Sequence, residues 1–453
     1  METILICSKH DLYPGLKEEI KELAQEADLD IIREIWFNSP PNIKQYATKT
    51  IIEQIKEEHE EIEAILIPVE LKPRQYNTLA EKIGENVELI DRVNLLLQVF
   101  EKKADSYEAK LEIQLAKLKY LTPRLQTTLK KAMTKERAGF FSSGEMKRED
   151  LTRDVKRKIN NLEKKLEQAY QKTTKIMEQR KKKTNLPLIP ILGFYSTGKT
   201  TVFNYLTDLN RPTGEKPFVT MAAKIARTKK LGLPIDFADS VGLTLLPLDI
   251  LDTFRITFDP LLKDDLGIII LDLSRTTQRN IEEVELIKKN ISHITKKSVT
   301  IFEQNKTNTF RLIPIFTKID KTRDPKEKAK TILKLITTKE EKQEENGKNE
   351  IYGIIKENAI FEHDLILFSN KMTSQEITMF QQKLSKTIKR YLTPQLINMT
   401  LKNVPPHVKH KLYEIGEITL EKITPRGEII IKGVFYSSPL QKVLQQNPQI
   451  RIV

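Results

Sequence analysis

The chain has 453 residues, of which 39% are hydrophobic and 30% charged, and its net charge is +14. This length predicts about three domains, and the composition is that of a folded chain, not a disordered one. The single cysteine, Cys7, excludes an intramolecular disulfide, and no run approaches the ~18 apolar residues of a membrane span. Because the apolar run at the N-terminus is too short for a signal peptide, we expect a soluble, cytoplasmic protein, at most peripheral to a membrane.

The positive charge is concentrated in one segment. Residues 101–183 hold 24 Lys/Arg and 12 Asp/Glu, a balance of +12, whereas the other 370 residues hold 52 basic and 50 acidic groups, a balance of +2. A local basic segment is typical of a surface that binds a polyanion. A solvated helical face would give the same pattern, so charge alone leaves both interpretations open.

The first 91 residues alternate strand-like and helical stretches, which predicts a small N-terminal α/β domain with a parallel sheet. The expected strands lie at 3–7, 31–37 and 64–70, and the expected helices at 16–27 and 49–63.

Residues 92–184 are predicted to form a long basic helical hairpin. Apolar residues repeat at helical spacing from 92 to 120, and Thr122-Pro123 is expected to end this first helix. A second helix is predicted over about 149–182. The loop between them, 124–148, carries the side chains that we predict to bind RNA: Arg124, Lys130, Lys131, Lys135, Arg137, Lys147 and Arg148.

A second, larger α/β pattern extends over residues 185–395 and predicts a mostly parallel sheet with flanking helices. Its expected strands lie at 188–194, 234–239, 266–273, 310–316 and 364–369. Residues 338–350 are expected to be a charged, low-complexity loop. The remaining residues, 396–453, form a small C-terminal module in which alternation around Pro425-Arg-Gly427 predicts a β-hairpin.

The strongest motif follows the first strand of this larger domain. Residues 193–200 match G-x-x-x-x-G-K-S/T and precede a helical stretch. In this layout glycines let backbone N–H groups surround a phosphate, and the helix N-terminus adds partial positive charge. We expect Lys199 to reach the β- and γ-phosphates and the Thr200 hydroxyl to bind Mg²⁺. The predicted phosphate contacts are Gly193, Phe194, Tyr195, Ser196, Thr197, Gly198, Lys199, Thr200 and Thr201.

Two further elements predict a nucleotide-dependent switch. Asp239 ends a strand and begins Asp239-Ser240-Val241-Gly242, where the carboxylate would hold Mg²⁺ through water and the glycine N–H would sense the γ-phosphate. Upstream lies Phe218-Val219-Thr220, whose threonine would complete the Mg²⁺ shell. Leu243 follows Gly242 where many GTPases place a water-orienting glutamine, so we predict slow intrinsic hydrolysis.

Two elements at later strand ends predict guanine selectivity. Asp320, in Thr317-Lys318-Ile319-Asp320, could accept hydrogen bonds from both N1–H and N2–H₂ of guanine, a donor pair that adenine lacks. Ser369-Asn370-Lys371 would place a backbone N–H at guanine O6. Four ordered elements on strand ends therefore indicate an α/β fold with a P-loop GTPase domain that hydrolyses GTP with Mg²⁺.

Beyond these general motifs, the chain resembles the HflX family of translational GTPases over about residues 60–320. The resemblance in the helical region rests on Asp91-Arg92, Leu95, Leu97, Phe100, Ala104, Glu108, Leu111, Leu115-Ala116, Leu118, Tyr120 and Pro123-Arg124-Leu125. Elsewhere it rests on Leu71, Pro73, Gln75, Leu79, residues 198–207, Phe218-Val-Thr220, Asp239–Gly242, Leu246-Pro247 and Phe254-Arg255. A hydrophobic residue such as Leu243 after the motif glycine is also similar to the family pattern.

The resemblance implies a GTPase that engages the large ribosomal subunit in its GTP state and splits, rescues or recycles ribosomes, with the hairpin tip directed at the peptidyl-transferase centre. We expect the protein to be a monomer. The chain departs from the family's Arg-Gly-Pro-Gly-Glu loop, because 140–145 read Phe-Phe-Ser-Ser-Gly-Glu, and Leu151-Thr152 replaces an Asp-Arg pair. Thr317 stands where Asn is usual and Asn370 where Ala is common. The alternative is a GTP-switched scaffold that binds a protein or an anionic membrane surface instead of rRNA.

Overall fold

The structure is a computed structural model of the chain. It describes residues 1–12, 16–57, 62–84, 87–104, 106–135, 141–184, 186–194, 196–207, 224–239, 246–301, 308–345, 365–425 and 427–453. The chain divides into two compact units. The first comprises Met1–Lys172, Glu215–Ala222 and Leu245–Thr257, and the second comprises Thr173–Gly214, Ala223–Thr244 and Phe258–Val453.

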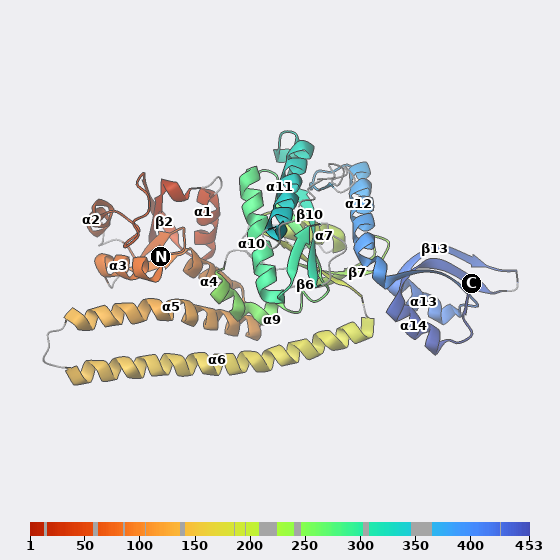
Figure 1. Cartoon of the computed structure of the whole chain (residues 1–453), viewed down its shortest axis with the longest axis horizontal. Coiled ribbons are helices and arrows are strands. Elements are labelled where there is room, and N and C mark those ends of the chain that lie inside the picture. The colour runs from red at the N-terminus through yellow and green to blue at the C-terminus, as the bar shows by residue number, and fades with distance from the viewer. Residues whose placement is uncertain are drawn as a thin grey trace. The chain divides into compact units, whose positions relative to one another are not determined.

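The first unit begins with the predicted α/β domain. Its four-stranded parallel sheet has the order β2-β1-β3-β4 within the described residues. The strands are β1 (Glu2–Ser8), β2 (Asp30–Phe37), β3 (Ala64–Ile67) and β4 (Glu88–Asp91), and the helices are α1 (Leu16–Glu26), α2 (Lys49–Glu57) and α3 (Pro73–Ile83) (Figure 1). Isoleucines from β1 and β3 lie at the centre of its apolar core.

Three helices follow the sheet: α4 (Arg92–Lys103), α5 (Tyr107–Lys135) and α6 (Phe141–Thr184). The predicted helix end at Thr122-Pro123 is wrong, because Pro123 lies inside α5. A proline inside a helix costs about 3 kcal/mol. Contacts of the neighbouring residues offset that cost. Tyr120 is 3% exposed, and Arg124 Nη1 donates a hydrogen bond to the Tyr120 carbonyl at 2.7 Å.

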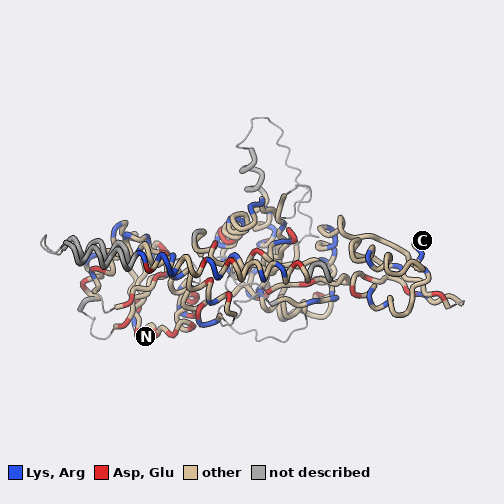
Figure 2. The backbone as a smooth tube through the Cα atoms, turned by 90° about the horizontal axis from the view of Figure 1, so that it is seen from below, with Lys and Arg blue, Asp and Glu red and all other residues tan. Residues whose placement is uncertain are grey.

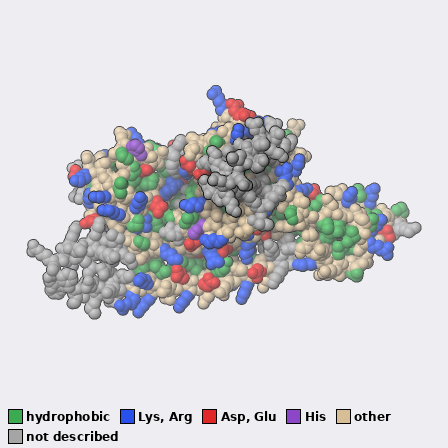
Figure 3. Space-filling view, viewed as in Figure 1, with side chains coloured by type: hydrophobic (Ala, Val, Ile, Leu, Met, Phe, Trp, Pro, Cys, Tyr) green, Lys and Arg blue, Asp and Glu red, His purple; other side chains and the backbone are tan. Residues whose placement is uncertain are grey.

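Helices α5 and α6 form a hairpin as predicted, but the predicted loop over 124–148 is wrong, because α5 continues to Lys135 and α6 already begins at Phe141. Leu111 and Leu115 of α5 share an apolar cluster with Leu162 and Leu166 of α6, and Lys119 Nζ lies 2.8 Å from a Glu163 carboxylate oxygen. The other faces of α6 are exposed over much of 153–179 and carry Lys and Arg interleaved with Asp and Glu (Figures 2 and 3). Apolar contacts therefore hold the hairpin together, and charge lies on its outer surface.

The second unit contains the predicted larger sheet. Its order is β11-β10-β8-β5-β7-β6, β9 pairs with β10, and the described pairs are parallel except for β6 with β7. The strands are β5 (Leu188–Gly193), β6 (Lys224–Thr228), β7 (Ile235–Asp239), β8 (Leu266–Asp272), β9 (Ser298–Ile301), β10 (Thr309–Thr317) and β11 (Ile366–Leu367). The helices are α7 (Lys199–Thr207), α10 (Thr277–Thr295), α11 (Pro325–Glu345) and α12 (Ser374–Leu392).

Helix α11 corrects one expectation. The stretch 338–350 was expected to be a loop, but α11 continues to Glu345, and the rest of the stretch lies outside the described residues. Its Lys and Glu residues are good helix formers even though they supply no core, which explains the extension.

The C-terminal module is larger than the predicted hairpin. It runs β12 (Leu396–Lys402), α13 (Pro406–Ile415), β13 (Gly416–Ile423), β14 (Ile429–Tyr436), α14 (Ser437–Gln446) and β15 (Arg451–Ile452). The hairpin of β13 and β14 is confirmed, and it sits in an antiparallel sheet of order β13-β14-β12-β15. This is a split β-α-β arrangement. Among the described residues of the whole chain, none of the helices is both long and apolar enough to span a membrane.

Candidate nucleotide-binding site

The predicted phosphate loop connects β5 to α7. Gly193 ends β5 with a φ of 151°, and a Cβ there would lie 2.9 Å from the carbonyl oxygen of Ile270. Gly198, directly before α7, has a φ of 93°. Both positions require glycine, since other residues rarely adopt these angles. The loop thus leads directly into the N-terminus of a helix, where backbone N–H groups are available for an anion.

Side chains hold the loop in place through Phe194. The carbonyl oxygen of Phe194 accepts a hydrogen bond from Lys199 Nζ at 2.5 Å and another from Thr197 Oγ1 at 2.9 Å. Burial lowers the pKa of Lys199 to about 8, although the Asp239 carboxylate raises it, and Arg275 lowers it further. A bound phosphate would favour the charged ammonium form. Tyr195 lies outside the described residues.

The candidate Mg²⁺ ligands meet at the start of α7. Thr200 Oγ1 donates to Asp239 Oδ2 at 3.1 Å, and Asp239, at the end of β7, is 1% exposed. A hydroxyl and a carboxylate are hard oxygen donors of the kind that Mg²⁺ prefers, so these two residues fit the ion. The other predicted switch residues lie outside the described part of the chain: Phe218, Val219, Thr220, Ser240, Val241, Gly242 and Leu243.

The residue that replaces the usual asparagine connects two parts of the site. Thr317, at the end of β10, donates from its hydroxyl to the Thr197 carbonyl at 2.7 Å, and the Leu271 carbonyl lies 3.3 Å away. The next residue, Lys318, has a left-handed backbone and an ammonium 2.7 Å from Asp272 Oδ2. The structure therefore brings the predicted guanine motif against the phosphate loop.

The predicted base-contacting residues also come together. Asp320 Oδ1 accepts from Ser369 Oγ at 3.1 Å, and Asp320 Oδ2 lies 3.6 Å from Lys371 Nζ. Burial raises the pKa of Asp320, but hydrogen bonds, including that from Ser369, and the Lys371 charge outweigh it, so the net pKa is lowered. The carboxylate is therefore ionised, as an acceptor for guanine N–H groups must be. Ile319 is half-buried and Asn370 is exposed.

One predicted RNA contact is wrong. Arg124 is 4% exposed, because its Nη2 donates to the Leu71 carbonyl at 2.8 Å and its guanidinium carbon stacks 3.5 Å from the centre of the Tyr120 ring. A guanidinium enclosed in this way stabilises the first unit and does not reach a polyanion. The side chains of the other six predicted RNA contacts lie outside the described residues: Lys130, Lys131, Lys135, Arg137, Lys147 and Arg148.

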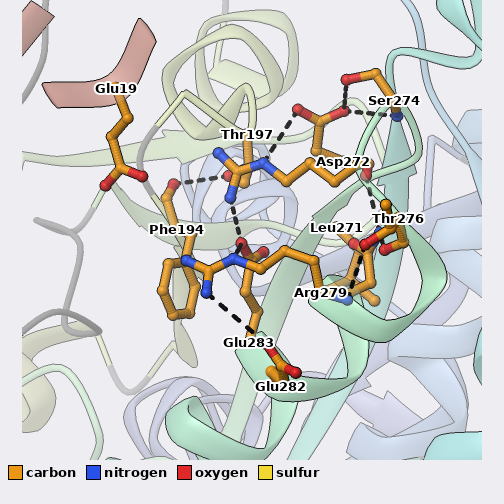
Figure 4. Close-up of polar contacts among 12 residues, drawn as sticks. Glu19, Phe194, Thr197, Leu271, Asp272, Ser274, Thr276, Arg279, Glu282 and Glu283 are labelled. Atoms are coloured by element: carbon orange, nitrogen blue, oxygen red, sulfur yellow. Dashed lines mark hydrogen bonds and ion pairs between the residues drawn. The ribbon is translucent and has the colours of Figure 1, made fainter. Parts of the chain in front are cut away.

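The residues that contact the guanine motif and the phosphate loop from neighbouring elements were not predicted from the sequence. Asp272, at the end of β8, binds Lys318, and its Oδ1 accepts from Ser274 N at 2.9 Å (Figure 4). Arg279 of α10 lies over the Phe194 ring, and Glu283 accepts a hydrogen bond from Arg279. A polar residue at the end of the apolar β8 strand was a signal for Asp272, whereas nothing in the local sequence of α10 indicates its position beside the loop.

Family models match most of the chain in three pieces. "GTP-binding GTPase N-terminal" matches residues 16–101, "GTP-binding GTPase Middle Region" matches 103–180, and "50S ribosome-binding GTPase" matches 188–306. The GTPase HflX of Saccharolobus solfataricus is 32% identical over 270 residues, which cover 59% of this chain and 75% of that protein. The chain belongs to the HflX family of GTPases.

This HflX-family GTPase is also similar to other proteins. The GTPase HflX of Caldanaerobacter subterraneus is 29% identical over 307 residues, covering 65% of this chain and 70% of that protein. A crystal structure of a GTP-binding protein from Sulfolobus solfataricus in complex with GDP is 25% identical, covers 87% of this chain and 99% of that one, and has a TM-score of 0.41. The predicted family, the P-loop GTPase fold and the GTPase activity are confirmed.

Proposed function

We propose that this HflX-family GTPase binds the large ribosomal subunit in its GTP-bound form and acts in splitting, rescue or recycling of ribosomes. The observation that carries the proposal is the basic helical hairpin, whose segment 101–183 holds nearly all of the net positive charge. Ribosomal RNA is a dense polyanion, and the release of its counterions favours binding of such a segment. The match of residues 188–306 to a family described as a 50S ribosome-binding GTPase supports the same partner.

The nucleotide would bind with Lys199 at its phosphates and Asp320 at its base. Thr200 and Asp239 would hold Mg²⁺, and Thr220 remains the proposed third ligand. When bound, the ion neutralises charge on the β- and γ-phosphates. Because Leu243 cannot orient a water molecule, we propose that intrinsic hydrolysis is slow and that the bound state supplies the missing group.

The segment after Asp239 suggests how the nucleotide would act on the hairpin. Residues 246–257 belong to the first unit, where Ile256 lies in the apolar cluster of α5 and α6. Glu112 of α5 accepts hydrogen bonds from Thr257 N at 3.2 Å and Thr257 Oγ1 at 2.6 Å. The chain passes from Asp239 to this docked segment through residues 240–245. We propose that a nucleotide-dependent change at Asp239 acts on the hairpin through this covalent connection.

GTP turnover with and without purified large ribosomal subunits tests the proposal. We expect a slow basal rate that rises at least tenfold with large subunits. A tenfold rise corresponds to a barrier lowered by about 1.4 kcal/mol. Small subunits, as the matched control, should raise the rate little. A rate that large subunits leave unchanged would contradict the proposal. Cosedimentation with anionic vesicles and capture of protein partners would then examine the scaffold alternative.

The hairpin itself can be tested through salt dependence. If Lys130 and Lys131 contact rRNA, the slope of log binding constant against log salt should become less steep in K130A/K131A, by about one for each lost contact. Two exposed lysines outside the hairpin, Lys289 and Lys326, provide a matched control. An equal slope for K130A/K131A and K289A/K326A would remove these two hairpin residues from the interface.

A further inference from the structure

A group of charges around the buried Glu283 carboxylate of α10 lies beside the phosphate loop. The Glu283 side chain is 1% exposed, and its Oε1 accepts from Arg279 Nε at 3.1 Å and also from Arg275 Nη1. Arg275 Nε in turn lies 3.6 Å from Asp272 Oδ2. One carboxylate thus holds two guanidinium groups at the N-terminal end of α10, which Thr276 caps by accepting a hydrogen bond from Arg279 N.

Arg279 connects this group to the loop that binds phosphate. Its guanidinium carbon lies 5.3 Å from the centre of the Phe194 ring, and Figure 4 shows Arg279 between that ring and Glu283. Phe194 is 3% exposed, and its carbonyl oxygen is the acceptor for Lys199 Nζ at 2.5 Å. A continuous series of contacts therefore runs from Glu283 through Arg279 and Phe194 to the lysine of the phosphate loop.

We propose that Arg279 and Glu283 are positioning residues for the nucleotide, which hold Phe194 from α10 and thereby orient Lys199 toward the phosphates. A guanidinium over an aromatic face is attracted by the ring, and the attraction is stronger where water is excluded. The Arg279 side chain is long, so holding it in one orientation costs rotamer freedom that its contacts must offset. The buried Glu283 carboxylate fixes it in the orientation that meets the ring. This inference concerns the nucleotide site and is independent of any ribosome contact.

Nucleotide affinity of the full chain tests this role. We expect R279A to weaken binding of fluorescent GDP and GTP analogues about tenfold, with KM for GTP raised by a similar factor and kcat changed less. E283Q keeps a hydrogen-bond acceptor but loses its charge, and it should weaken binding about threefold. K289A removes an exposed positive charge from the same helix and should bind both nucleotides as the wild type does. Wild-type affinity in both R279A and E283Q would overturn the proposal.

A double-mutant cycle with Phe194 separates positioning from a general effect on the fold. F194L keeps apolar volume and removes the ring face. If Arg279 acts through the ring, R279A should weaken nucleotide binding less than twofold in the F194L background, against about tenfold in the wild type. The same factor in both backgrounds would overturn the proposal. R279K provides a second variant if R279A does not fold: it keeps the charge without the planar group and should lie between R279A and wild type in affinity.

Discussion

The chain contains a parallel N-terminal sheet and a larger, mostly parallel sheet. The polar groups at their carboxyl edges, here called the closed edge and the open edge, are used in opposite ways. At the N-terminal sheet these groups bond to one another: Asp91 accepts from Leu71 N at 3.2 Å, from Asn94 N at 3.0 Å and from the Tyr120 hydroxyl. At the larger sheet, Thr200 and Asp239 meet at the end of a loop that carries Lys199 and whose glycines have positive φ angles.

Strand order alone does not make a ligand site. Parallel sheets bring polar residues to one edge, and ligands commonly bind there. In the N-terminal sheet a helix supplies buried partners: Arg124 of α5 lies 3.7 Å from the Asp91 carboxylate. The larger sheet instead ends in a loop with positive φ angles and a lysine, both suited to an external anion. Variants at the two edges should therefore affect different properties.

The largest expected effect is at the open edge. K199A removes the ammonium that would contact the β- and γ-phosphates, and the loss of such a charge-assisted contact should weaken GDP and GTP binding by about a thousandfold. Titration with fluorescent nucleotide analogues measures this loss. The free energy of unfolding of the first unit should stay unchanged, which urea unfolding followed by Trp36 fluorescence reports, because the single tryptophan lies on β2. Retained nucleotide affinity in K199A would refute the role assigned to the loop.

At the closed edge the expected effect is on stability. R124A leaves the Asp91 carboxylate without its buried cation and should lower the free energy of unfolding of the first unit by about 3 kcal/mol. Urea unfolding followed by Trp36 fluorescence measures the change. Nucleotide affinity should stay within a factor of two of the wild type. A stable R124A protein with weakened RNA binding would instead restore the contact that burial of Arg124 argues against.

These two edges also show what sequence can predict. Gly193, Lys199 and Thr200 are neighbours in the chain, so their spacing alone indicates a phosphate loop. Arg124 illustrates the limit: a count of charges does not distinguish a basic side chain on the surface from one enclosed by Tyr120 and Leu71.

Other differences have the same cause. The rule that proline ends a helix fails at Pro123, because contacts of α5 with distant parts of the chain outweigh a local cost. Arg279 and Glu283 meet Phe194 only after the sheet and α10 have formed, so no spacing in the sequence connects them. Local chemistry is therefore predictable, and support that comes from distant segments is not.

The contact between Glu112 and the segment 246–257 should make the stability of the first unit depend on pH, which distinguishes this contact from both sheet edges. Burial raises the pKa of Glu112 to about 8, although hydrogen bonds from Thr257 lower it. Between about pH 4.5 and 8 the folded state then binds a proton that the unfolded state has released, so stability falls as pH rises. From pH 6 to pH 8 the wild type should lose about 2 kcal/mol more than E112Q, which stays neutral. Urea unfolding followed by Trp36 fluorescence at both pH values measures the difference, and parallel curves would show that Glu112 is ionised throughout.

The smallest expected effect concerns the contact that joins the guanine motif to the phosphate loop. Thr317 donates to the Thr197 carbonyl at 2.7 Å, and valine has the same shape without the hydroxyl. T317V should therefore leave a buried carbonyl unpaired and weaken GDP binding about fivefold, equivalent to about 1 kcal/mol.

T317N supplies the matched comparison, because an asparagine amide can donate to the same carbonyl and should keep GDP affinity within a factor of two of the wild type. If T317V binds GDP as tightly as T317N does, the hydroxyl contributes nothing to affinity. The open edge would then depend on Lys199 and the backbone alone, without the support of β10. A loss of affinity in T317V alone would show that the open edge, like the closed one, relies on a side chain that bonds to a distant carbonyl. The difference is that at the open edge this bond shapes a loop for a ligand.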